Sequence, residues 1–178
     1  MMDKRYVLAL TGADRIGIVE HVTELLLECG GDVQASRMAR LGGEFAMLLL
    51  VSVPEAGADR LPKIIERLQG EDFKVSVTET EWGVAARRKD WLPYRIEVRG
   101  ANHEGIIHKI AEHLSQMGIN IESIETNVTP APMSGAPLFT MDAIVVVPPD
   151  LPKHKWQDDL EEAADDANVE LTVSLYKD

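Results

Sequence analysis

The chain has 178 residues, of which 45% are hydrophobic and 27% are charged, a mixture typical of folded globular proteins and unlike that of disordered or fibrous chains. Its 18 Lys and Arg against 30 Asp and Glu give a net charge of −12, and residues 90–178 alone carry 6 basic against 16 acidic side chains, a net charge of −10. Because neutralising phosphates requires clustered Lys and Arg, this acidic half argues against direct binding of DNA or RNA.

Hydropathy and cysteine content indicate the cellular compartment. The longest mostly apolar stretches, residues 45–53 and 143–147, fall well short of the ~20 residues that a membrane helix needs. The apolar run at residues 6–10 is too short for a signal peptide. The single cysteine, Cys29, leaves no internal disulfide and no CxxC metal or redox site. We therefore expect a cytoplasmic protein that does not associate with membranes.

In the first half of the chain, hydrophobic periodicity predicts six elements in the order βαββαβ. A β-branched run ends at Gly12, an apolar helical face follows, and Gly30-Gly31 ends that helix. Two strands then flank Gly42-Gly43, which can adopt the positive φ of a tight hairpin turn. The predicted elements are a strand at 6–11, a helix at 18–29, strands at 33–41 and 44–53, a helix at 61–70 and a strand at 73–77.

The second half repeats this order. Its hairpin is longer, because Thr129–Pro137 contains three prolines, cannot form a two-residue turn, and is expected to be an exposed loop. The predicted elements are a strand at 94–100, a helix at 104–117, strands at 120–129 and 138–147, a helix at 156–167 and a strand at 169–176.

An internal repeat explains this similarity. Shifting the sequence by 88 residues gives eight identities, among them Tyr6 with Tyr94, Gly12-Ala13 with Gly100-Ala101 and Gly17-Ile18 with Gly105-Ile106. The predicted fold class is α+β: two tandem ferredoxin-like βαββαβ units, each an antiparallel sheet with both helices on one face. We expect one domain at residues 1–84, a linker at 85–91 and a second domain at 92–178.

The third strand of the first unit is apolar on both alternations. Phe45, Met47, Leu49 and Val51 lie on one side, and Ala46, Leu48 and Leu50 on the other. This pattern predicts a strand that is buried on both faces, and therefore a surface that covers the sheet from the side opposite the helices.

The segments between the first strand and the first helix of each unit carry a family resemblance. They read Thr11-Gly-Ala-Asp-Arg-Ile-Gly-Ile-Val19 and Arg99-Gly-Ala-Asn-His-Glu-Gly-Ile-Ile107, and each helix ends at a Gly that precedes Asp32-Val or Asn120-Ile. These features resemble ACT domains. Two copies with a Pro-rich second hairpin and no attached enzyme resemble the glycine cleavage system transcriptional repressor family. That resemblance implies a regulatory protein that senses an amino acid, expected to be glycine, and acts through a DNA-binding activator.

The resemblance also implies a ligand site. In ACT domains that bind amino acids, an asparagine three residues before the loop glycine and another eighteen residues further on face the ligand across a domain interface. Exposed N–H groups at a helix start attract a carboxylate, and glycine allows close approach. The candidate ligand-binding residues are Asn102, His103, Glu104, Gly105, Ile106 and Asn120 in the second copy, and Asp14, Arg15, Gly17 and Asp32 in the first.

Two alternatives stay open for these residues. Asp14 and Asn102 are also good helix N-caps, and Asp32 and Asn120 are of types that commonly start a strand after a C-cap glycine, so each could be purely structural. In the first copy, two carboxylates can hold an ammonium but repel a carboxylate. Either Arg15 offsets them, or the first copy binds something else.

The sequence contains no catalytic motif. His103-Glu-Gly-Ile-Ile-His108 has one residue too many for a zinc-protease HExxH, and GxSxG, GxxxxGK[ST] and GxGxxG are absent. We expect no enzyme activity, no metal and no cofactor. We expect glycine or serine as ligand and a protein partner, with a homodimer left open. The alternative function is a detached amino-acid-binding regulatory subunit of a metabolic enzyme.

Overall fold

The computed structural model describes residues 3–80, 88 and 90–177. The chain divides into two compact units, Met1–Gly83 and Val84–Asp178, hereafter unit 1 and unit 2. The predicted linker, residues 85–91, lies mostly outside the described residues.

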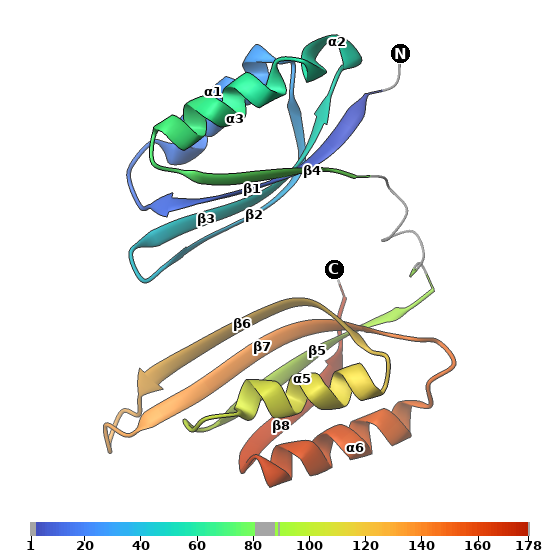
Figure 1. The fold of residues 1–178 in the computed structure, drawn as a ribbon. Coiled ribbons are helices and arrows are strands. Elements are labelled where there is room, and N and C mark those ends of the chain that lie inside the picture. Colours follow the sequence, from blue (N-terminus) through green and yellow to red (C-terminus); the bar gives the residue numbers. More distant parts are fainter. Residues whose placement is uncertain (1–2, 81–87, 89, 178) are drawn as a thin grey trace. The chain divides into compact units, whose positions relative to one another are not determined.

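Unit 1 is a four-stranded antiparallel sheet with strand order β2-β3-β1-β4. Helices α1 and α3 cover one face (Figure 1). A four-residue helix, α2, was not predicted, since a single turn is too short to show a hydrophobic period. The elements are β1 (Lys4–Ala13), α1 (Ile18–Glu28), β2 (Asp32–Leu41), β3 (Glu44–Val53), α2 (Glu55–Ala58), α3 (Leu61–Gly70) and β4 (Lys74–Glu79).

Unit 2 repeats the topology with strand order β6-β7-β5-β8. Helices α5 and α6 lie on one face of its sheet (Figure 1). The predicted α+β class, with two tandem ferredoxin-like βαββαβ units, is confirmed. The elements are β5 (Leu92–Ala101), α5 (Ile106–Gln116), β6 (Asn120–Pro130), β7 (Pro137–Val147), α6 (Lys153–Asp166) and β8 (Val169–Leu175).

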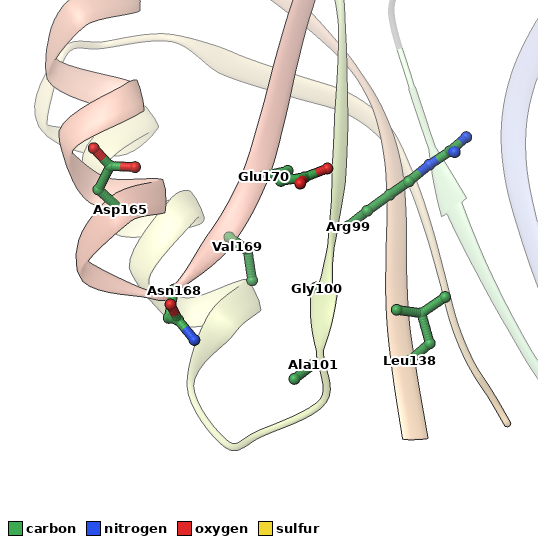
Figure 2. A pocket seen from close by; sticks show the side chains of 8 residues that line it. All are labelled: Arg99, Gly100, Ala101, Leu138, Asp165, Asn168, Val169 and Glu170. Atoms are coloured by element: carbon green, nitrogen blue, oxygen red, sulfur yellow. The ribbon is translucent and has the colours of Figure 1, made fainter. Parts of the chain in front are cut away.

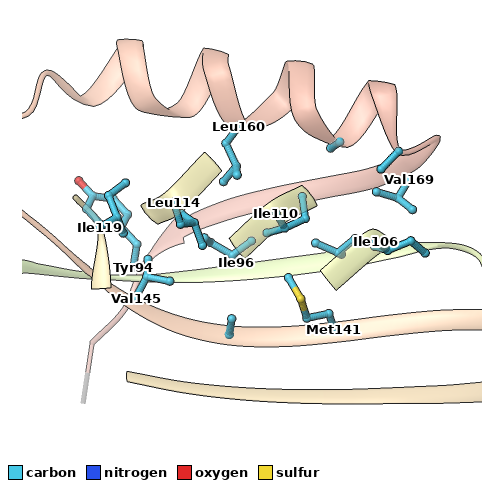
Figure 3. Packing of buried hydrophobic residues seen from close by; sticks show 14 of the residues in the cluster. Tyr94, Ile96, Ile106, Ile110, Leu114, Ile119, Met141, Val145, Leu160 and Val169 are labelled. Atoms are coloured by element: carbon cyan, nitrogen blue, oxygen red, sulfur yellow. The ribbon is translucent and has the colours of Figure 1, made fainter. Parts of the chain in front are cut away.

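Each unit has its own hydrophobic core between its helices and its sheet. In unit 2 the Trp156 ring meets Tyr94 edge to face, with centroids 5.1 Å apart and an interplanar angle of 72°. Ile96, Ile110 and Leu160 belong to the same core cluster and are at most 1% exposed (Figure 3). Each fully buried aliphatic side chain contributes roughly 1.5–3 kcal/mol to folding, so the two cores account for the separate compactness of the units.

Within unit 1, β3 is buried on its helix side only, and the surface expected to cover its other side stays a prediction. Met47 and Leu49 on the helix side are 3% and 0% exposed, whereas Leu48 on the opposite side is 46% exposed. The reason is that α1 and α3 pack on only one face of the sheet. The equivalent outer face of unit 2 is not apolar, because β5, β7 and β8 place charged side chains there: Arg95, Glu97, Arg99, Asp142 and Glu170.

The Pro-rich hairpin is shorter than predicted. Thr129 pairs with Leu138 and Pro130 with Pro137, so both ends of the expected loop belong to strands β6 and β7. The remaining residues, 131–136, are closed by a hydrogen bond from the Ala131 N–H to the Ala136 oxygen, 2.8 Å long. Prolines are tolerated here because they lie at the end of an edge strand and in a turn. Across the described residues, no helix is long and apolar enough to cross a membrane.

Candidate functional site

The loops after β1 and β5 have the same backbone geometry. Gly17 and Gly105 are the N-cap residues of α1 and α5, with φ of 92° and 91°, and neither helix start has a side-chain cap. A Cβ built on either glycine would meet nothing within 4 Å, so open space adjoins the backbone there. Glycine is required by the positive φ rather than by crowding.

The reading of Asp14 and Asn102 as helix N-caps is wrong, since the cap position falls three residues later at the glycine. Both residues instead tie their loops to a hairpin. The Asp14 N–H donates to the Gly43 oxygen at 3.0 Å, and the Asn102 N–H donates to the Pro137 oxygen at 2.9 Å. The loops are thus held by the backbone, which leaves the side chains free for other contacts.

In unit 1 the loop charges are already paired. The Asp14 carboxylate lies 3.8 Å from Arg40 on β2. Arg15 lies 3.7 Å from Glu71 and stacks on the Phe73 ring at 4.8 Å. Arg15 therefore does not offset the negative charge of Asp14, which was one of the two alternatives left open by the sequence. Arg40 does, and nothing in the sequence spacing pointed to it.

In unit 2, His103 bridges the loop to the end of α6. Its Nδ1 lies 2.9 Å from the Glu104 oxygen and its Nε2 lies 2.6 Å from the Ala167 oxygen. Because both partners are carbonyls that only accept, the two contacts require both ring nitrogens to be protonated. The hydrogen bonds to the Glu104 and Ala167 backbone raise the pKa of His103 above its ordinary value, which favours the imidazolium at the negative end of a helix dipole.

The other two predicted loop residues of unit 2 differ in what they offer a ligand. Glu104 has an exposed side chain, and its backbone oxygen accepts the His103 contact. Ile106 is 2% exposed and its side chain belongs to the core. Only the backbone of Ile106 is therefore available to a ligand at the helix start.

The opposite ends of the units carry Asp32 and Asn120, each at the start of a strand with a β-bulge two residues later. The Gln34 amide donates to the Asp32 carboxylate at 2.5 Å, whereas the Asn120 amide donates to the Glu122 carboxylate at 2.6 Å. Each bulge thus holds one carboxylate and one carboxamide. In unit 1 the carboxylate of Asp32 comes before the carboxamide of Gln34, and in unit 2 the carboxamide of Asn120 comes before the carboxylate of Glu122.

In unit 2 a third group joins this bulge pair. Arg88 lies 3.5 Å from Glu122 and stacks over Trp91, with the guanidinium carbon 5.3 Å from the ring centroid. Gln34, Glu122 and Arg88 were not predicted as site residues. A polar residue two positions after Asp32 or Asn120 was the available signal.

The structure does not bring the ten predicted residues together. Asn102 is bonded to Pro137 at one end of β7, and Asn120 pairs with Val146 at the other. Nine residues at about 3.3 Å each separate these points by roughly 30 Å. Within one unit, the loop group and the bulge group are therefore two separate places.

The predicted residues do not line the main hollow of unit 2. This hollow, of about 560 Å³, is lined by seven residues of β5, β7, α6 and β8 and by Asn168 in the turn between α6 and β8. Within the described ranges, no group of three or more His, Cys, Asp or Glu could hold a metal ion.

Comparison with known proteins gives the family context. Residues 4–78 match the family model described as the ACT domain. A 46-residue segment is 44% identical to the glycine cleavage system transcriptional repressors of Escherichia coli strain K12 and Shigella flexneri. That segment covers 26% of this chain and 24% of each relative, so the chain matches about a quarter of the length of these curated relatives.

Two solved structures share the whole tandem fold. A crystal structure of an unknown protein from Galdieria sulphuraria superposes with a TM-score of 0.83 at 29% identity, over 99% of this chain and 100% of that one. A structure provisionally identified as a glycine cleavage system transcriptional repressor superposes with a TM-score of 0.73 at 19% identity, over 100% of both chains. Residues 4–78 therefore resemble an ACT domain, unit 2 repeats the same topology, and a 46-residue segment of the chain resembles glycine cleavage system transcriptional repressors.

Proposed function

We propose that this chain is a non-enzymatic cytoplasmic regulator that senses a small amino acid, glycine or serine, and modulates transcription through a protein partner. The observation that carries the proposal is the repeated glycine-led helix start, whose backbone is open at Gly17 and Gly105. Similarity to the glycine cleavage system repressors supports the regulatory role.

The loop of unit 2 is the better candidate for the ligand. Exposed N–H groups at the start of α5 and the imidazolium of His103 favour a carboxylate. The exposed Glu104 disfavours an acidic ligand and can attract an ammonium. In unit 1 the corresponding charges are paired, Asp14 with Arg40 and Arg15 with Glu71, so fewer groups there are available to a ligand.

Thermal unfolding of the full chain tests the ligand. An amino acid that binds only the folded state raises stability by about 2.7 kcal/mol at a hundredfold excess over Kd. We expect glycine or serine to raise the melting temperature, Asn102→Ala to abolish the rise, and the matched change Asp14→Ala to keep it. Asn120→Ala tests whether the far end of unit 2 takes part. If none of the twenty amino acids moves the wild-type melt at millimolar concentration, a ligand-free interaction scaffold is the better description.

The acidic surface supports action through a partner rather than through DNA. Residues 90–178 carry a net charge of −10, which repels a nucleic acid backbone and favours a basic protein surface in a salt-sensitive manner. We expect no shift of duplex DNA by the protein alone in gels at low salt. A specific complex at micromolar protein would contradict this part of the proposal.

The second candidate function is a detached regulatory subunit of a metabolic enzyme, which the same ligand site would serve. Co-purification from the native cell separates the two functions. A basic DNA-binding protein supports transcriptional regulation, whereas recovery of an enzyme supports the alternative. Size-exclusion chromatography with light scattering would show whether the chain is a homodimer.

A further inference from the structure

The outer face of the unit 2 sheet, on the side away from α5 and α6, carries two arginines in different electrostatic states. The Arg95 guanidinium forms an ion pair with Asp142 on β7. Arg99, four residues further along β5, lies directly opposite Glu170 on β8 in the sheet register. Arg99 and Glu170 nevertheless form no ion pair, whereas Arg95 and Asp142 do. We call the ion-paired Arg95 and Asp142 the closed pair, and the unpaired Arg99 and Glu170 the open pair.

The open pair borders the hollow of about 560 Å³ in unit 2 (Figure 2). A second hollow, of about 290 Å³, shares both Arg99 and Glu170 and continues along β5 and β8 to Glu97 and Thr172. Arg99 and Glu170 project from neighbouring strands, and both side chains are exposed. A cation and an anion therefore stand side by side on one groove with solvent access to each.

The next row of the sheet is apolar. Ala101 and Leu138 are register partners on β5 and β7, and both line the larger hollow. They lie two residues beyond Arg99, or roughly 7 Å along the strand. Glu97, two residues before Arg99 on the same face of β5, lines the smaller hollow and adds a carboxylate. The groove thus presents a cation, an anion, an apolar patch and a further carboxylate.

We propose that this groove binds a free α-amino acid with an aliphatic side chain. Its carboxylate pairs with the Arg99 guanidinium, whose planar donors suit a carboxylate. Its ammonium pairs with Glu170, and its side chain lies on Ala101 and Leu138. Glu97 disfavours acidic side chains. This site is distinct from the loop of residues 102–106 in the proposed function, and it takes a larger ligand.

Titration of the ¹⁵N-labelled full chain with L-leucine tests the groove, read from the amide resonances of Gly100, Ala101 and Glu170. Because both charges are exposed, we expect saturable shifts with Kd on the order of 1 mM. We expect 4-methylpentanoate, which lacks the ammonium, and 3-methylbutylamine, which lacks the carboxylate, each to bind about fivefold more weakly. Glutamate should bind more weakly than leucine.

Matched variants assign the contacts. Arg99→Gln and Glu170→Gln should each weaken leucine binding about fivefold, whereas Arg95→Gln, which opens the neighbouring closed pair, should leave Kd within about twofold. Asn102→Ala should leave leucine binding intact, so failure of the loop site and failure of the groove are distinguishable. Equal binding of leucine and 4-methylpentanoate would overturn the proposal in favour of an anion site. Absence of saturable shifts at 20 mM, taken as about twenty times the expected Kd, would overturn it altogether.

Discussion

The two units fasten the same loop with different chemistry. Arg15 and His103 occupy equivalent positions in the 88-residue repeat, and each reaches the turn that precedes the last strand of its unit. Arg15 does so through Glu71 and the Phe73 ring, whereas His103 does so through the Ala167 carbonyl. We call these contacts the clamps of the two units. The clamp of unit 1 uses the permanently charged guanidinium of Arg15, and the clamp of unit 2 uses the titratable imidazole of His103. Both units thus place a basic side chain at this position, and the two side chains differ in kind.

A second cation belongs to the clamp of unit 2. The Lys109 ammonium donates to the Asp166 oxygen at 3.0 Å, beside the His103 contact with Ala167. Helix α6 has no basic residue in its own last turn. Cations from the loop and from α5 therefore compensate the negative end of the α6 dipole, which the acidic last turn of that helix would otherwise leave unbalanced.

The largest effect is expected from the core of unit 2, where the two units differ most in content. Trp156 is 1% exposed and packs edge to face on Tyr94, and unit 1 buries no tryptophan among its described residues. Trp156→Ala should lower the free energy of unfolding by about 3–5 kcal/mol. Urea denaturation followed by circular dichroism measures the loss. A loss below about 1 kcal/mol would show that Trp156 contributes little to the stability of unit 2.

The next effect distinguishes two equivalent glycines. A Cβ on Gly100 would lie 2.7 Å from Val169 Cγ1 and 3.1 Å from its Cα, whereas one on Gly12 would lie 2.6 Å from the edge of the Phe73 ring. The Val169 backbone is fixed by pairing with Gly100, but the ring can move. We expect Gly100→Ala to destabilise by about 3 kcal/mol and Gly12→Ala by about 1 kcal/mol. The reverse order in urea denaturation would contradict this assignment.

The clamps should differ in their response to pH. Because the folded state raises the pKa of His103, its contribution to stability is complete below its unfolded pKa of about 6.5 and is lost as pH rises through the folded value. The wild-type urea midpoint should therefore fall, relative to that of His103→Gln, from pH 6 upward. Lys109 opposes the shift and Glu104 adjoins the ring, so Lys109→Gln should move the loss to higher pH. Parallel profiles for wild type and His103→Gln would rule out the charged clamp.

The smallest effect belongs to the clamp of unit 1. Arg15 is 55% exposed and Glu71 is 35% exposed, and exposed ion pairs contribute little. Arg15→Ala should destabilise by at most about 1 kcal/mol, by the same amount at pH 6 and at pH 8. A pH-dependent difference would show that the neighbouring His21–Glu71 contact at 2.7 Å, rather than Arg15, governs this turn.

The strands and the longer helices could be predicted because their signals are local. The apolar faces of α1 and α5 and the alternation in β3 and β7 occur within a few residues of sequence. The loop contacts could not be predicted, since Arg15 pairs with Glu71 and Asp14 with Arg40, far along the chain. The N-cap alternative for Asp14 and Asn102 fails because a glycine with positive φ places the helix start beyond them. The candidate residues were identified by type, but their roughly 30 Å separation depends on the sheet register.

Heteronuclear NMR titration of the full chain with glycine tests the proposed sensing function most directly, because the loop glycines of the two units report separately. Gly105 directly follows His103 and the exposed Glu104, whereas the charges around Gly17 are paired. We predict that the amide resonances of Gly105 and Ile106 shift saturably while those of Gly17 and Ile18 shift little. Saturable shifts at Gly17 alone, or unmoved resonances at both loops at millimolar glycine, would contradict a glycine sensor that works through unit 2.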